Sequence, residues 1–166
     1  APELFVVYPE RMVVEPGAVQ AVRVQWKGPA NPGRELCFRI VAEQLPVEFA
    51  GPDGSGAAIR VLFRYLGAVY VVPPAAAPDV VLASSRMATD AAGHAGLELV
   101  FANRGTAHAI LGGLSITVGS RTFGEGALAG IIGENVLPGL ARRFFLPLDP
   151  PPEEGADVTF TFEALR

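Results

Sequence analysis

Glycine and proline interrupt this chain so often that long helices are excluded. The 166 residues include 19 glycines and 15 prolines, and both residue types are unfavourable inside a helix. The segments between them are short, and many alternate between apolar and polar residues, as half-buried strands do. The sequence therefore predicts an all-β fold of short strands joined by turns.

The longest extended segment, residues 57–72, carries the most unusual pattern. Large apolar residues occupy every second position of its first half, namely Ile59, Val61, Phe63 and Tyr65. The segment is about three times as long as the commonest strands, and Gly67 predicts a kink or bulge near its middle. It is either a central strand buried on both faces, or an edge strand left open for another chain, as in β-augmentation.

Shorter strands are predicted on both sides of this segment. In the first half, residues 19–26 and 35–45 alternate, and a helix is the competing interpretation for the second of them. The sequence Glu15-Pro16-Gly17 predicts a type II turn ahead of the first. In the second half, strands are predicted at residues 80–83, 97–102, 107–118, 121–123, 142–146 and 158–162.

A Pro- and Ala-rich segment separates the two halves. It begins at Pro73 and contains no charged residue before Asp79, and such segments are stiff and extended. We interpret residues 74–79 as a linker. It divides the chain into an N-terminal domain, residues 1–73, and a C-terminal domain, residues 80–166.

Charge and composition exclude several classes of function. The net charge is −4 and the sequence has no block of Lys and Arg, so nucleic acid and anionic membranes are poor partners. The single cysteine, Cys37, leaves no internal disulfide and no thiolate-rich metal site, and we expect it to be a buried small apolar residue. The longest apolar run is too short to cross a bilayer, so membrane insertion is not expected.

Catalytic patterns are absent from the sequence. His94 and His108 have no nucleophile motif around them, and the G-x-S-x-G motif does not occur. A surface or packing role is the simpler interpretation for both histidines. Asp149 lies in a proline-rich segment that reads as a solvated loop. The residues therefore favour a binding or structural protein, without a metal or cofactor, over an enzyme.

Several short motifs follow one another in an order that is similar to one known family. Residues 8–24 contain Tyr-Pro, Glu-Pro-Gly and Val-Arg-Val, and residues 34–46 contain Arg-Glu, Phe-Arg-Ile and Leu-Pro. Residues 59–73 run from Ile-Arg-Val to Val-Val-Pro, and weaker matches lie at residues 99–105 and 136–139. Together they resemble the periplasmic pilus-assembly chaperones of the chaperone–usher pathway, the PapD-like family, and within it the archaic, Csu-type branch.

This resemblance implies two immunoglobulin-like β-sandwich domains, of which the first lacks its N-terminal strands in this chain. It implies a periplasmic chaperone that binds pilin subunits, donates a β-strand to them and delivers them to an outer-membrane usher. The donor side chains would be Ile59, Val61, Phe63 and Tyr65. Without a subunit, the apolar strand should pair with itself in a capped homodimer. Because the chain begins near the family's fourth strand, we expect an N-terminally trimmed form rather than a degenerate relative.

The resemblance also implies two charged sites. The family's lysine that anchors the subunit carboxylate aligns with Ala68, so Arg64, which shares its strand parity, is the candidate anchor, with Arg60 second. Arg23 and Glu35 match an inter-domain salt bridge whose third member we place at Asp149.

Three alternatives stay open at this point. Arg23 and Glu35 could be cross-strand neighbours on a solvated face. The whole chain could be a structural or adhesive tandem of immunoglobulin-like domains without a client groove. A hydrolase would have to rest on His94 and His108, which have no nucleophile motif beside them in the sequence.

Overall fold

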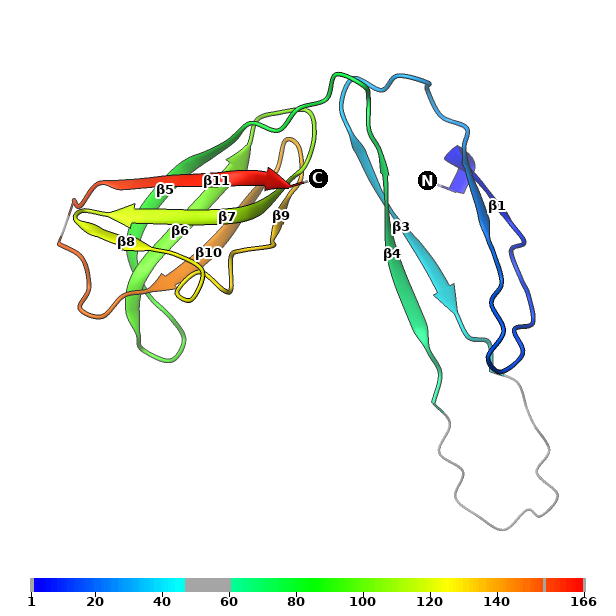
Figure 1. The fold of residues 1–166 in the computed structure, drawn as a ribbon, viewed down its shortest axis with the longest axis horizontal. Coiled ribbons are helices and arrows are strands. Elements are labelled where there is room, and N and C mark those ends of the chain that lie inside the picture. The colour runs from blue at the N-terminus through cyan, green and yellow to red at the C-terminus, as the bar shows by residue number, and fades with distance from the viewer. Residues whose placement is uncertain (1, 47–60, 154, 166) are drawn as a thin grey trace, which may run out of the picture. The chain divides into compact units, whose positions relative to one another are not determined.

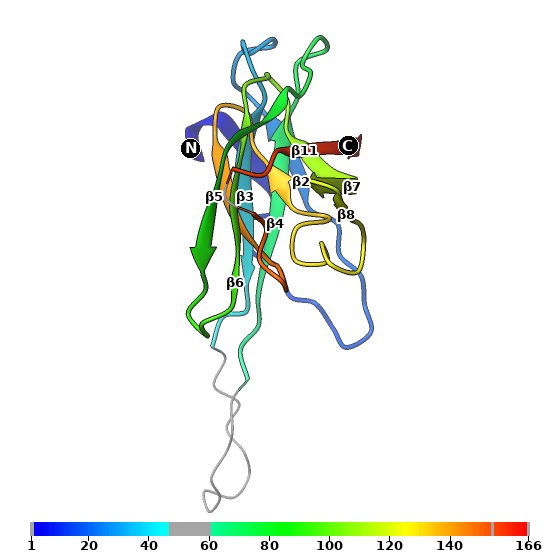
Figure 2. The ribbon, with the colours of Figure 1, turned by 90° about the vertical axis from the view of Figure 1, so that its left-hand side faces the viewer.

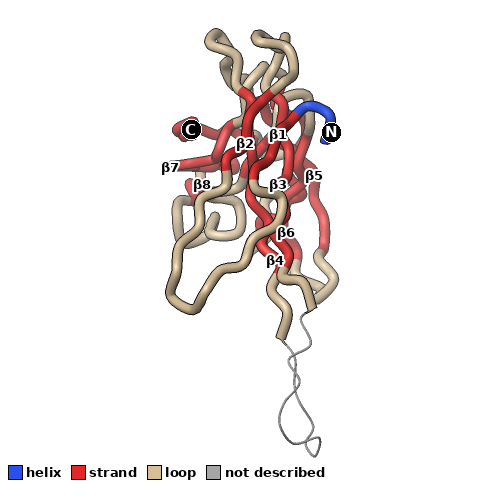
Figure 3. Tube along the Cα trace, turned by 90° about the vertical axis from the view of Figure 1, so that its right-hand side faces the viewer, coloured by secondary structure: helices blue, strands red, loops and turns tan. Residues whose placement is uncertain are grey.

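A computed structural model of the chain describes residues 2–46, 61–153 and 155–165. Strands in antiparallel sheets make up its regular structure, and the one helical segment among the described residues is a 3-10 turn, η1 (Pro2–Leu4) (Figures 1 and 3). The all-β prediction is therefore confirmed. In the described part of the chain, no helix has the length and apolar character that crossing a membrane requires.

The chain divides into two compact units that are not simply its two halves. The first unit comprises Ala1–Asn31 and Leu36–Val71, and the second comprises Pro32–Glu35 and Val72–Arg166. The chain therefore leaves the first unit, contributes four residues to the second, and returns to the first.

In its described residues, the first unit contains two antiparallel strand pairs. One pair joins β1 (Phe5–Tyr8) to β2 (Arg23–Trp26), and the other joins β3 (Leu36–Glu43) to β4 (Arg64–Val71) (Figure 1). Three aromatic side chains link the pairs, because Phe5 packs edge-on against Trp26 and Phe38, at ring-centroid distances of 5.1 and 4.8 Å. Aromatic pairs in this geometry add to the stability that area burial alone supplies.

Local predictions in the first unit had mixed outcomes. The type II turn is confirmed: the Ala18 N–H donates to the Glu15 carbonyl oxygen at 2.9 Å, and Gly17 has a φ of +75°. The strand expected at residues 19–26 begins only at Arg23. Cys37 is half-buried rather than buried.

Gly67 does not interrupt β4. The register between β3 and β4 runs without a shift from Leu36–Val71 to Glu43–Arg64, so the expected bulge is wrong. A glycine is used there because the opposite strand is close: a Cβ atom on Gly67 would lie 2.9 Å from Cγ2 of Ile40.

The second unit contains two larger sheets. One has the strand order β10-β6-β5, and the other has the order β11-β7-β8, with the short β9 paired to β7 (Figures 1 and 2). The bounds of the first sheet are β5 (Val80–Thr89), β6 (Ala95–Asn103) and β10 (Ala141–Pro147). Those of the second are β7 (Ala109–Val118), β8 (Arg121–Phe123), β9 (Asn135–Val136) and β11 (Val158–Leu165).

The core of the second unit lies between these two sheets. Alternate residues of β6 and β7 are buried, among them Leu99, Phe101, Leu111 and Ile116, all with no exposed surface. Phe101 of the first sheet packs edge-on against Phe160 of the second, with ring centroids 4.9 Å apart. The buried residues of β6 keep one parity, whereas in β7 the buried parity changes at Gly112 and Gly113, between Leu111 and Leu114. In β11, Val158, Phe160 and Phe162 pack against this core, as the alternation in the sequence predicts.

The strands predicted in the second half all lie in or overlap observed strands. The prediction at residues 121–123 is confirmed to the residue. β5 is much longer than expected, because it continues through Ser84 and Ser85 after a register shift between Leu82 and Ser84. The two-residue β9 has no alternating pattern that could have predicted it.

The Pro- and Ala-rich segment belongs to the second unit and packs within it. Pro73 and Ala76 are buried, and the Ala77 carbonyl oxygen accepts hydrogen bonds from the N–H groups of Thr106 at 2.8 Å and Ala107 at 3.1 Å. The segment is thus held by the loop at residues 103–108, which we call the junction loop.

Candidate functional site

An exposed apolar stretch leads into β4. Residues 61–66, which we call the donor stretch, contain five large apolar side chains, each more than half exposed: Val61, Leu62, Phe63, Tyr65 and Leu66. Phe63 and Tyr65 lie on one face of the strand, with their rings stacked at a centroid distance of 6.2 Å. Exposed apolar patches of this kind mark interaction sites in soluble proteins.

The donor stretch continues the ladder of a two-stranded sheet. The Gln44 N–H donates to the Phe63 carbonyl oxygen at 2.9 Å, which extends the pairing of β3 with β4 beyond the end of β4. Among the described residues, β4 pairs with β3 alone. Its other edge therefore presents backbone N–H and C=O groups that another strand could bind.

Arg64 lies within the donor stretch and is paired across the sheet. It stands opposite Glu43 in the register, and its Nε lies 2.8 Å from Oε1 of Glu43. Both side chains are more than half exposed, so the pair contributes less than about 1 kcal/mol to stability. The other two candidates of this region, Ile59 and Arg60, lie outside the described residues.

Glu35 forms the most deeply buried carboxylate–imidazole pair of the second unit that the structure describes. Its side chain is 1% exposed, and both carboxylate oxygens accept from Nδ1 of His108, at 2.7 and 2.8 Å. The His108 backbone N–H also donates to Oε2 of Glu35, at 3.1 Å. Buried carboxylates persist when hydrogen bonds compensate them, and His108 supplies these from its backbone and its imidazole.

The expected inter-domain network has its members in different units. Arg23 lies in β2 of the first unit, whereas Glu35 and Asp149 belong to the second. The network of these three residues stays a prediction. The pairing of Glu35 with His108 was missed by the sequence interpretation, because the two residues are 73 positions apart and no local motif connects them.

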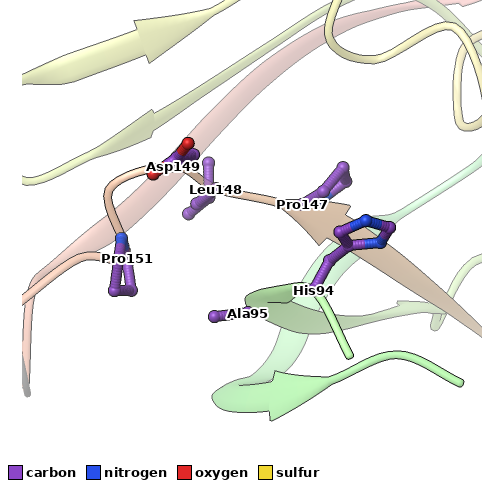
Figure 4. A pocket seen from close by; sticks show the side chains of 6 residues that line it. All are labelled: His94, Ala95, Pro147, Leu148, Asp149 and Pro151. Atoms are coloured by element: carbon purple, nitrogen blue, oxygen red, sulfur yellow. The ribbon is translucent and has the colours of Figure 1, made fainter. Parts of the chain in front are cut away.

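Asp149 and His94 line a shallow hollow of about 260 Å³ in the second unit (Figure 4). The carboxylate of Asp90 binds Nδ1 of His94 at 2.9 Å, and this hydrogen bond lowers the pKa of Asp90 below its ordinary value. The other lining residues are Ala95, Pro147, Leu148 and Pro151, so the lining contains no Ser, Thr or Cys nucleophile. In the described part of the chain, no three His, Cys, Asp or Glu side chains form a possible metal site.

Comparison of this chain with family models, with curated proteins and with solved structures finds no match. The functional argument therefore rests on the residues themselves and on their geometry. Of the surfaces described above, the donor stretch is the one that combines large exposed apolar side chains with a strand edge that has no partner among the described residues.

Proposed function

We propose that this protein is a periplasmic chaperone of the chaperone–usher kind, which binds pilin subunits by donating the donor stretch and β4 as an extra strand. The observation that carries the proposal is the donor stretch. Its side chains are large, apolar and exposed, and they lie beside a strand edge that is open within the described residues. A subunit lacking one strand needs both a backbone ladder and apolar side chains at every second position.

The strand order of the second unit supports an immunoglobulin-like sandwich. In such folds, strands A, B and E share one sheet and strands C and F share the other. We assign β5, β6 and β10 to strands A, B and E of the first sheet. In the second sheet, β7 then corresponds to strand C, β11 to strand F, and β8 to an added strand beside C. The chain order and the sheet order agree under this assignment.

The strand pairs of the first unit support the same interpretation. In an immunoglobulin-like domain, strands D and E pair in one sheet and strands F and G pair in the other. The pairs β1–β2 and β3–β4 match D–E and F–G in chain order. β4 then corresponds to the last strand of the domain, which is the donor strand in the family that the sequence resembles.

The energetics favour capture of a subunit. Burying Val61, Phe63 and Tyr65 in a groove would contribute about 1.5–3 kcal/mol for each side chain. Ordering and docking remove part of this gain. The backbone hydrogen bonds along the open edge of β4 add to what remains.

The direct test is co-purification with a pilin-like subunit, for which the candidates are the secreted proteins encoded next to this one. We expect the full chain to capture that protein, and the double variant Val61→Asp with Phe63→Asp to lose it. Because both side chains are already exposed, the double variant should unfold at nearly the same temperature as the original. Val19→Asp is the matched control, since Val19 is 93% exposed in the same unit but lies outside the donor stretch.

Three outcomes would contradict the proposal. If the double variant still captures the subunit, binding does not use the donor stretch. If the double variant fails to fold, these side chains belong to a core. If the folded, unaltered chain captures no subunit, the chain is better explained as a structural tandem without a client groove.

A further inference from the structure

The path of the chain between β2 and β3 is unusual. Ala1–Asn31 and Leu36–Val71 belong to the first unit, while Pro32–Glu35, which lie between them, belong to the second. Leu36, the first residue of β3, directly follows Glu35. Whatever holds Glu35 in the second unit therefore also fixes the point at which β3 begins.

Glu35 is held by the junction loop through backbone and side chain together. Its N–H donates to the Thr106 carbonyl oxygen at 2.8 Å, and its carboxylate accepts from the backbone and the imidazole of His108. Of the two side chains, Glu35 is 1% and His108 is 11% exposed. Changing either side chain removes the buried hydrogen bonds between the carboxylate and the imidazole, so the pair is costly to break.

The junction loop holds a second chain segment in the same way. The Ala77 N–H lies 3.1 Å from Oγ1 of Thr106, and the Thr106 N–H donates to the Ala77 carbonyl oxygen. Ala77 follows β4 along the chain, as Glu35 precedes β3. Both segments that connect the β3–β4 pair to the second unit are therefore bound by one loop of that unit.

We propose that the pair Glu35–His108 is a latch that makes the first unit unfold together with the second. The coupling runs through the chain itself. When the latch is closed, the start of β3 is anchored, so that the β3–β4 pair forms from a restrained chain with less entropy to lose. When the contact between Glu35 and His108 is broken, the first unit keeps its internal contacts, but the start of β3 is no longer anchored. This inference is independent of the proposed chaperone activity.

Urea unfolding of the full chain tests the latch, because the two units have separate reporters. Trp26 is the one tryptophan of the sequence and lies in the first unit, so its fluorescence follows that unit. Amide hydrogen exchange at Leu99 and Ile116, in β6 and β7, follows the second. In the unaltered chain, we expect both reporters to change at the same urea concentration.

The variant Glu35→Gln should separate the two transitions. It keeps the size of the side chain and removes its charge, and we expect the unfolded fraction of the first unit at a fixed urea concentration to rise roughly tenfold. Glu98→Gln is the matched control, because it removes the ion pairs of Glu98 with Arg86 and Arg143 in the β10-β6-β5 sheet, away from the junction loop. Its two transitions should stay together.

Two results would overturn the latch. The first is that the two units of the unaltered chain unfold at different urea concentrations. The second is that the two units of the Glu35→Gln variant still unfold at the same urea concentration. If the Glu35→Gln variant does not fold, native-state hydrogen exchange of the unaltered chain tests whether the two units unfold together. The amides of β2 and of β6 must then open with the same free energy in the native state, and unequal values reject the proposal.

Discussion

Asn103 shows how a single side chain can order several loops. It is 1% exposed, and its Nδ2 donates to the carbonyl oxygens of Ala107, at 2.7 Å, and Val136, at 2.9 Å. Its Oδ1 accepts from the N–H groups of Asp79, at 3.1 Å, and Gly105, at 3.0 Å. The amide uses all four of its principal hydrogen-bonding positions. It therefore holds the junction loop, the end of the Pro- and Ala-rich segment and β9 in one place.

Asn103→Ala should destabilise the second unit by about 2–4 kcal/mol, because it leaves several part-buried backbone groups without partners. The free energy of unfolding in urea, followed by circular dichroism, measures the loss. Asn31→Ala is the control, since Asn31 is exposed and should change stability by less than about 0.5 kcal/mol. An Asn103 variant as stable as the original would show that water replaces the amide at little cost.

At the scale of elements, β4 and the donor stretch combine features that a strand in a folded core avoids. The stretch is apolar on both parities, yet its side chains are exposed, and β3 supplies the one partner edge among the described residues. The single charge in the stretch, Arg64, is paired with Glu43 on that partner strand. The strand is thus tied to the protein on one side and open on the other.

Variants of Arg64 and Glu43 allow the effect of the Arg64 charge on subunit binding to be separated from its effect on the stability of the fold. Arg64→Ala and Glu43→Ala break the same exposed ion pair, so each should change the free energy of unfolding by less than about 1 kcal/mol. If Arg64 anchors the terminal carboxylate of a subunit, only Arg64→Ala should abolish capture, which co-purification with the subunit measures. If the Arg64→Ala variant captures the subunit as well as the Glu43→Ala variant does, the anchor for the subunit carboxylate is another residue.

At the scale of the whole molecule, the open edge has a consequence for association. Exposed apolar strand edges pair with other strands, and a second copy is always present in a solution of the pure protein. We expect the chain to form a dimer without a subunit, and sedimentation velocity to show the monomer when Phe63 is changed to Asp. A dimer that persists in this variant, or a monomer in the unaltered chain at high concentration, would contradict this expectation.

The sequence by itself determined the features that depend on a few neighbouring residues. The type II turn follows from Pro16 and Gly17, because their preferred backbone angles suit its two central positions. The inward faces of β6 and β11 follow from alternation, because successive side chains of a strand point to opposite faces, whereas β7 changes its buried parity at Gly112 and Gly113. The all-β class follows from breakers that are too frequent for helices.

Only the tertiary structure decided which distant groups meet. Glu35 and His108 are 73 positions apart, and their pairing depends on the chain's return to the second unit, which no local pattern encodes. The exposure of the donor stretch was open for the same reason, since its apolar pattern suits a central strand as well as an edge strand. Periodicity specifies which side chains share a face, whereas the neighbours of that face depend on how the remote segments pack.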